Sequence, residues 1–279
     1  MSVLRRLYYT LPPRSRRLAR RLIYAPLDAW DFMQGKNQGY PSRGQVFTGL
    51  GDFKATGDRF LRYFIELGGL QPEGSVLDIG SGIGRMAIPL SRYLNEQGRY
   101  EGFDPVPEGI EWCQRHLSRQ HPHFAFTLVD LENDLYTSTG ASATQFRFPY
   151  LDQQFDLAIL TSVFTHMLPE EVENYLSEIQ RTLKPGGRCL ATFFILNEKA
   201  HAQMAAHPDH FQFPHDYGHY RLLDAKVKAA NVAYEESYLR EQFTQRGLSV
   251  VSMHYGFWSG RPKADSLEFQ DVVILERNE

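Results

Sequence analysis

The sequence predicts an α/β fold in which strands and helices alternate, as they do in doubly wound sheets. The first observation is the stretch Ser75 to Arg85 (SVLDIGSGIGR), in which a short apolar run leads directly into a glycine turn. The second is a further strand at 100–104 that ends in an acid twenty residues beyond Gly84. The third is that apolar runs and helical patterns continue to alternate as far as Leu196.

Composition limits the class of protein before any motif is considered. The chain has 279 residues, 42% of them hydrophobic, which is enough for one large domain or a domain with a cap. Its net charge of −3 gives no general attraction to nucleic acid, and no apolar run approaches the roughly 18 to 20 residues of a membrane span. Cys113 and Cys189 lack a metal-binding spacing. We expect both to be reduced core residues of a cytoplasmic protein, with a disulfide between them as the less favoured alternative.

Residues 1–45 are predicted to form a basic, amphipathic N-terminal arm. Arginines alternate with leucines as far as Ile23, and the pair Pro12-Pro13 is expected to divide the arm into two short helical pieces. Three interpretations remain open. The arm could be a surface helix that packs its leucines on the domain, or it could be attracted to an acidic substrate or to the anionic inner face of a membrane. A mitochondrial-type targeting segment is the third, and a secretory signal is disfavoured because no continuous apolar core follows the arginines.

The segment between the arm and the central strand is rich in glycine and aromatic residues. Between 34 and 57 this composition predicts a loop, and Asp58 is the expected N-cap of the helix that follows. Phe47 and Gly51 are candidates to fold over the ligand end of the sheet. A plain connection with buried aromatic residues is the alternative.

The glycine turn is the main candidate ligand site. Gly80, Gly82 and Gly84 follow Asp78 in the order Asp-x-Gly-x-Gly-x-Gly, at the predicted N-terminus of a helix. This spacing differs from the Gly-x-Gly-x-x-Gly of dinucleotide binders, so a dehydrogenase is disfavoured. Asp104 lies where an acid accepts hydrogen bonds from ribose hydroxyls in nucleotide-binding sheets.

The later strands also end in polar side chains. A strand at 124–129 ends in Asp130, and 131–146 reads as a loop. The strand at 155–160 continues into Thr161 and Ser162, so its end is expected to border the same crevice.

Residues 197–237 interrupt the alternation and carry five histidines among aromatic residues. Their irregular spacing does not match a zinc pattern, so no metal is expected. We interpret this segment as an inserted lid, with His215, Tyr217 and His219 facing the substrate. A surface insertion whose aromatic residues only pack together is the alternative.

Four motifs follow one another along the chain: VLDIGSGIG at 76–84, GFD at 102–104, FDLA at 155–158 and LKPGG at 183–187. Together they resemble the successive motifs of the class I S-adenosylmethionine-dependent methyltransferases. The resemblance implies a Rossmann-like sheet of seven strands in the order 3-2-1-4-5-7-6, with the last strand antiparallel and helices on both faces. It also divides the chain into a methyltransferase domain, 46–196 with 238–279, and the inserted lid at 197–237.

The resemblance assigns S-adenosyl-L-methionine as the cofactor and gives its parts to particular residues. Asp78 and the glycine turn would face the methionine part, Asp104 the ribose, Asp130 with Leu131 the adenine, and Thr161 with Ser162 the sulfonium and the acceptor. The predicted cofactor residues are Phe47, Gly51, Asp78, Gly80, Ser81, Gly82, Gly84, Arg85, Asp104, Asp130, Leu131, Thr161 and Ser162.

The expected reaction is O-methylation of a small molecule, sugar or lipid head group. His166 is the candidate base, because it follows strand four closely and imidazole titrates near neutral pH. His215 or His219 could serve instead, and His166 could be structural. No Asn-Pro-Pro-Tyr type sequence follows strand four, which disfavours methylation of nucleic-acid bases. A non-catalytic S-adenosylmethionine-binding or scaffold protein on the same fold remains the alternative.

Overall fold

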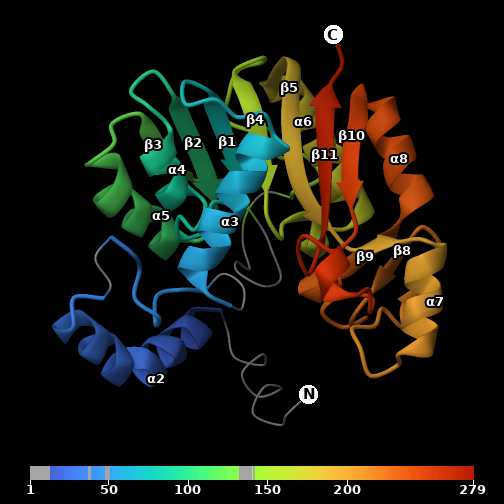
Figure 1. Ribbon diagram of the computed structural model, residues 1–279, viewed down its shortest axis with the longest axis horizontal. Coiled ribbons are helices and arrows are strands. Elements are labelled where there is room, and N and C mark those ends of the chain that lie inside the picture. Colours follow the sequence, from blue (N-terminus) through green and yellow to red (C-terminus); the bar gives the residue numbers. More distant parts are fainter. Residues whose placement is uncertain (1–12, 37–38, 48–50, 132–139, 141) are drawn as a thin grey trace.

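The computed structural model describes residues 13–36, 39–47, 51–131, 140 and 142–279. Its centre is a seven-stranded sheet in the order β3-β2-β1-β4-β5-β11-β10 (Figure 1). Neighbouring strands are parallel except β11, which runs antiparallel to both β5 and β10. The predicted strand order and the reversed last strand are therefore confirmed. The strands are β1 Ser75–Ile79, β2 Arg99–Asp104, β3 Phe124–Leu128, β4 Phe155–Leu160, β5 Leu183–Phe193, β10 Leu248–His254 and β11 Asp271–Arg277.

Helices cover both faces of this sheet and divide the core in two. Helices α3 (Phe53–Glu66), α4 (Ala87–Tyr93) and α5 (Pro107–Cys113) pack on one face, and α6 (Pro169–Thr182) and α8 (Glu236–Gln245) on the other. Alternation along β1 decides which side chain belongs to which core, because successive residues of a strand point to opposite faces. Val76 packs with α3 and α4, whereas Leu77 packs with α6 and α8.

Helix α3 begins earlier than the sequence predicted. Its N-cap is Asp52, whose carboxylate accepts a 2.8 Å hydrogen bond from the Ala55 amide, so the assignment of Asp58 as the cap is wrong. The misleading residue is Gly57, which suggested a loop but lies inside the helix. A Cβ at Gly57 would come within 2.5 Å of the Arg85 carbonyl oxygen, so this glycine allows α3 to pack closely against the glycine turn.

The N-terminal arm is a single helix over its described part. Helix α2 spans Pro13–Met33 and contains Pro26, while the first predicted helical piece lies in residues 1–12, outside the described residues. Leu18, Leu22 and Ile23 are 60%, 67% and 68% exposed. For the described leucines, the interpretation that they pack on the domain is therefore wrong, while Leu4, Leu7 and Leu11 lie outside the described residues.

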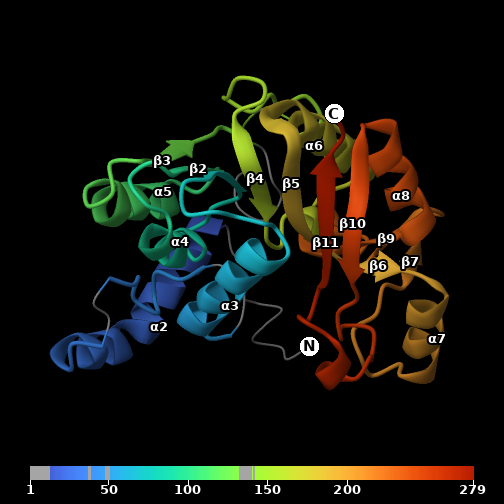
Figure 2. The same ribbon diagram turned by 45° about the horizontal axis from the view of Figure 1, so that its top comes forward.

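Residues 197–237 form most of a second, smaller sheet beside the end of β5 (Figure 2). Its order is β6-β9-β8-β7, and helix α7 (Glu198–Ala206) follows β6. No helix among the described residues is long and apolar enough to cross a bilayer. Cys113 and Cys189 are free and buried, as expected. The strands of the small sheet are β6 Ile195–Leu196, β7 His215–Asp216, β8 Tyr220–Leu222 and β9 Val232–Glu235.

Candidate cofactor and acceptor site

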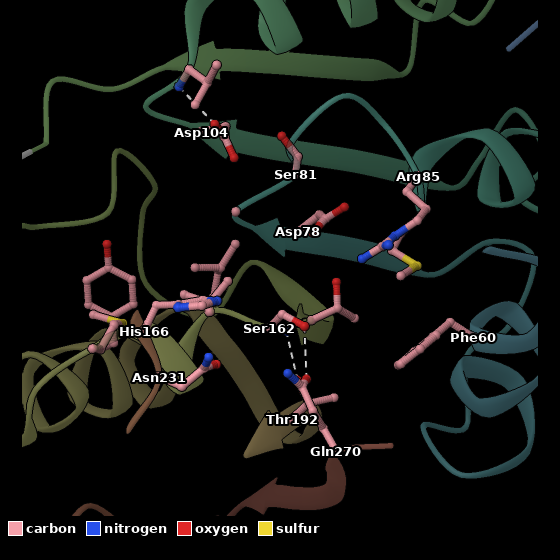
Figure 3. Close-up of a pocket in the computed structure, with 18 of the residues that line it drawn as sticks. Phe60, Asp78, Ser81, Arg85, Asp104, Ser162, His166, Thr192, Asn231 and Gln270 are labelled. Carbon is pink, nitrogen blue, oxygen red and sulfur yellow. Dashed lines mark hydrogen bonds between the residues drawn. The ribbon is translucent and has the colours of Figure 1, made fainter. Parts of the chain in front are cut away.

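A cavity of about 650 Å³ opens at the carboxyl ends of β1, β2 and β4. Its walls also include residues of α3, the turn after β4 and the segment that precedes β11, which Figure 3 shows converging on one hollow. This is the edge at which open α/β sheets bind ligands. The volume lies within the roughly 300 to 1,000 Å³ of small-molecule sites.

The glycine turn brings bare backbone to this cavity. Gly80, Gly82 and Gly84 have φ values of 81°, 57° and 81°, a region that side chains disfavour. A Cβ at Gly80 would lie 2.6 Å from Val163 Cγ2, so there is no room for one. The neighbouring Ser81 hydroxyl is buried, lines the cavity and has no hydrogen-bond partner within the described residues. Such a group is available to a ligand.

Asp104 is held by the backbone at the end of β2. One carboxylate oxygen accepts from the Gly82 amide at 2.9 Å and the other from the Val106 amide at 2.8 Å. Each oxygen retains a lone pair, so the carboxylate can still accept from ligand hydroxyls. Burial raises the pKa of Asp104 to about 6, against the two amide hydrogen bonds, which lower it.

Asp78 is the second buried acid of the cavity. The Tyr100 hydroxyl on the neighbouring strand donates a 2.6 Å hydrogen bond to its Oδ2. Burial, together with the charge of Asp104, raises the pKa of Asp78 to about 7, although the hydrogen bond from Tyr100 and the charge of Arg85 lower it. A ligand cation placed in this cavity would favour the ionised form of both acids.

The end of β4 is locally strained. Ser162 has a φ of 60°, which is unusual for a residue with a side chain. Its amide donates to Thr192 Oγ1 at 2.7 Å and its hydroxyl donates to Gln270 Oε1 at 2.9 Å, as the dashed lines of Figure 3 show. A backbone strain of roughly 1 to 3 kcal/mol persists only where its surroundings enforce it, and such positions cluster at ligand sites.

His166 lies in the short 3-10 turn Phe164–His166 and lines the same cavity. Its Nδ1 is 2.8 Å from the carbonyl oxygen of Ala229. Because a carbonyl only accepts, Nδ1 must carry the proton, which leaves the lone pair of the neutral ring on Nε2. Burial lowers the pKa of His166, against the carbonyls of Ala229 and Ala230, so the neutral ring is favoured at pH 7.

One end of the cavity has aromatic walls. Phe194, Phe211 and Phe269 all line it, and their ring centroids are 5.2 to 6.0 Å apart. Next to Phe269, Glu268 accepts hydrogen bonds from Nε and Nη2 of Arg59, the second at 3.0 Å. The cavity therefore combines buried polar groups, aromatic walls and the ion pair of Arg59 with Glu268.

Residues 76–187 match a family model whose description is a methyltransferase domain. This part of the chain is a methyltransferase domain of the class I S-adenosylmethionine-dependent type. The match begins in β1 and ends in β5, so it contains the glycine turn, Asp104, Ser162 and His166.

Other proteins resemble this methyltransferase in sequence or in fold. The chain is 25% identical over 178 residues to a protein of Gallus gallus named tRNA N(3)-cytidine methyltransferase METTL2, an alignment covering 61% of this chain and 37% of that one. The chain thus spans little more than a third of this curated relative. Among solved structures, the PH0226 protein of Pyrococcus horikoshii OT3 superposes with a TM-score of 0.58 at 12% identity, covering 84% of this chain and 95% of that one. The [4+2]-cyclase SpnF superposes with a TM-score of 0.53 at 16% identity, covering 92% and 95%.

S-adenosyl-L-methionine is the cofactor of this family, and the residues of the cavity suit it. Asp78 and Asp104 are buried acids beside a cavity that must accept a ligand with ammonium and sulfonium charges. The Ser81 hydroxyl and the bare turn at Gly80 leave polar contacts and space for the methionine part.

The cavity gathers most of the predicted cofactor residues of the methyltransferase, and leaves out four. Gly82 and Gly84 lie within the turn but do not line the cavity, and Gly51 and Asp130 are exposed to solvent. The predicted residues that line it are Phe47, Asp78, Gly80, Ser81, Arg85, Asp104, Leu131, Thr161 and Ser162, together with His166.

The predicted substrate residues of the lid point elsewhere. His215, Tyr217 and His219 are exposed and do not line the cavity. They belong to the β7–β8 hairpin, at the outer edge of the small sheet, where the Tyr217 ring stacks on Tyr220 with centroids 5.0 Å apart. From the predicted lid only Phe211 and Asn231 line the cavity.

The cavity also contains residues that sequence reasoning did not single out. Thr192, Gln270, Asn231, Arg59 and Glu268 all line it. Among the described residues no group of acids, histidines and cysteines could hold a metal ion.

Proposed function

We propose that this methyltransferase transfers a methyl group from S-adenosylmethionine to a hydroxyl of a small, partly apolar acceptor, with His166 as the base. One observation carries the proposal. The Ala229 carbonyl fixes the proton on His166 Nδ1, so the atom able to accept a proton is Nε2 of a ring that lines the cofactor cavity.

Bound S-adenosylmethionine supplies a methyl group already activated by positive sulfur. The protein then has to orient the acceptor, exclude water and remove the hydroxyl proton. Ser162, Thr192 and Gln270 form the hydrogen-bonded group that would orient it, and His166 Nε2 would accept its proton. Burial, which keeps the imidazole neutral, supports this role.

The character of the walls supports the acceptor class. Phe194, Phe211 and Phe269 offer flat apolar contact, while Asn231 and Gln270 offer hydrogen bonds nearby. The bridge between Arg59 and Glu268 crosses from α3 to the segment before β11. A concave site of this volume with apolar and polar walls favours a small molecule, a sugar or a lipid head group over a protein or nucleic-acid surface.

Proteins with a similar fold or sequence are named for other activities. The cyclase with a similar fold and the tRNA methyltransferase with a similar sequence show, by their names, that neither fold nor motifs dictate the acceptor. A protein that binds the cofactor without catalysis is the remaining alternative.

Isothermal titration followed by a transfer assay tests the proposal. We expect heat of binding with S-adenosylmethionine, and transfer of labelled methyl to a small-molecule fraction of a cell extract. Absence of binding heat would contradict a cofactor site. Binding without labelled product would support the scaffold alternative, and label confined to the RNA fraction would reject the small acceptor. Comparing metabolites of a deletion strain for a species lighter by one methyl group would then identify the acceptor.

A further inference from the structure

Helix α2 turns its polar side to the domain and its apolar side to solvent, the reverse of an ordinary surface helix. Its polar side faces the domain: Asp28 accepts from the amides of Arg43 and Gly44 at 2.8 and 2.9 Å. The buried carboxylate of Asp31 accepts from the Arg43 guanidinium at 2.7 Å, and Arg20 donates to the Arg43 carbonyl at 3.3 Å. Polar contacts to the segment 39–47 thus hold the helix.

The apolar side of α2 faces away from the domain. Figures 1 and 2 both show the helix at the edge of the molecule, below the sheet. Water is an unfavourable partner for so many neighbouring apolar side chains, and an exposed patch of this kind marks an interaction site. The apolar face is defined here as Leu18, Leu22, Ile23, Leu27, Trp30 and Met33, which are 49 to 71% exposed.

The same helix is strongly basic at its start. Its first nine residues include five arginines, and no acidic residue lies in its first turn. A helix with an apolar face and clustered arginines matches the character of a bilayer interface, where apolar groups enter the acyl boundary and cations meet anionic head groups. Trp30 adds an aromatic ring of the type that favours the level of the head groups.

We infer that α2 binds the surface of an anionic lipid bilayer through its apolar face, holding the protein at the membrane without crossing it. Charge decides between this partner and a second copy of the chain. A second α2 helix would carry the same five arginines in its first nine residues and no acid in its first turn, so like charges would repel, whereas anionic lipids attract them.

The position of α2 connects this surface to the site. The segment 39–47 that α2 holds ends at Phe47, which lines the cofactor cavity. The helix inferred to contact the bilayer is therefore bonded to the segment that supplies Phe47 to the cavity wall.

Sedimentation of the full chain with vesicles tests the inference. We expect the protein to pellet with roughly 3:1 phosphatidylcholine–phosphatidylglycerol vesicles at low salt, and much less with phosphatidylcholine alone. Binding should weaken as salt is raised, because salt screens the arginines. Equal recovery in the supernatant with and without anionic vesicles would overturn the inference.

A pair of variants separates the apolar face from a general effect of charge. Leu22→Glu with Ile23→Glu should lower the vesicle partition coefficient about tenfold or more, because two exposed apolar side chains are lost from the contact. Leu128→Glu with Leu151→Glu adds the same charge at two other exposed leucines and should bind nearly as the parent does. Equal binding by both variants would overturn the inference, as would a lipid-free dimer that the first variant abolishes.

Trp30 provides a second, independent measurement. It is 56% exposed, whereas the other two tryptophans, Trp112 and Trp258, are 5% and 2% exposed. Anionic vesicles should therefore shift tryptophan emission to shorter wavelength, and brominated lipids should quench it. Trp30→Phe should remove both changes while the protein still pellets. Unchanged emission on vesicles that pellet the protein would show that another surface binds.

Discussion

Arg59 and Glu268 lie 209 positions apart in the chain and form a two-point ion pair at the wall of the cofactor cavity. Arg59 belongs to α3, before the first strand, and Glu268 belongs to the segment before the last strand. Tyr63, one turn further along α3, donates to the Leu267 carbonyl at 3.1 Å. The two ends of the domain are therefore joined across the cavity.

Arg59→Ala should weaken the link between α3 and the segment before β11. We expect KM for S-adenosylmethionine to rise about tenfold, because Glu268 is no longer held at the cavity wall, and thermal stability to fall, because its carboxylate, only 13% exposed, loses its counter-charge. Steady-state kinetics and thermal unfolding measure the two effects. The matched control is Arg92→Ala, whose pair with Asp58 is about half exposed on both sides and should matter little. Equal effects of the two changes would show that the bridge has no special role.

Gly80→Ala should abolish cofactor binding. The new methyl group would meet Val163 at 2.6 Å in a backbone conformation that alanine disfavours. Gly186→Ala is the control, because Gly186 has a similar φ of 72° but nothing within 4 Å of its Cβ position. Titration with S-adenosylmethionine should show loss of binding in the first variant and normal binding in the second. Normal cofactor binding by Gly80→Ala would show that the cofactor does not need a glycine at this position.

The stability of the cofactor-free protein should fall as the pH rises from about 4 to about 7. In the folded state burial raises the pKa of Asp78 and Asp271 to about 7 and of Asp104 to about 6, from 3.8. Carboxyls that hold protons more tightly when folded stabilise the fold fully below the unfolded value of 3.8, and this contribution is lost as the pH passes 6 to 7.

Asp78→Asn should therefore be more stable than the parent at pH 8 by a few degrees in Tm, with little difference at pH 4. It should also bind S-adenosylmethionine more weakly, because the cationic ligand loses a carboxylate. Asp265→Asn, at an exposed position, is the control and should follow the parent at each pH. A Tm difference between Asp78→Asn and the parent that stays constant from pH 4 to pH 8 would contradict the raised pKa of Asp78.

His166→Gln should lower kcat roughly a hundredfold or more while leaving cofactor affinity nearly unchanged. The control is His116→Gln, because His116 Nδ1 also lies 2.8 Å from a backbone carbonyl, that of Trp112, but outside the cavity. In the parent, kcat should rise with pH through the lowered pKa of His166, and this limb should disappear in His166→Gln. Unchanged turnover would leave His166 only a structural role.

The sequence was most informative where chemistry and chain order coincide. Asp78, the glycine turn and Asp104 lie within one βαβ unit, so their spacing alone predicts that they meet. The orientation of the predicted lid could not be predicted, because its content of aromatic residues and histidines does not say which face of a hairpin packs on the domain. Tyr217 stacks on its neighbour in the small sheet and not on the cavity.

The missed residues have a common physical reason. Thr192 is the penultimate residue of β5, and Gln270 directly precedes β11, so neither stands in a motif. Their nearness to Ser162 depends on the pairing of β5 with β4 and β11, which is a tertiary property. The one available signal was the reversed last strand, since a strand that runs the other way must begin at the edge where its neighbours end.

That reversal has a consequence for how this protein can change its acceptor. The parallel strands deliver their final residues to the cavity, whereas β11 delivers the residues that come before it, Glu268, Phe269 and Gln270. The exposed part of the connection from β10 to β11, 262–265, can thus be lengthened, shortened or exchanged while every strand keeps its partners. Graft experiments that replace 256–270 with the matching connection of another family member would also remove Glu268, the partner of Arg59, and should therefore change substrate choice and methyl-donor binding together.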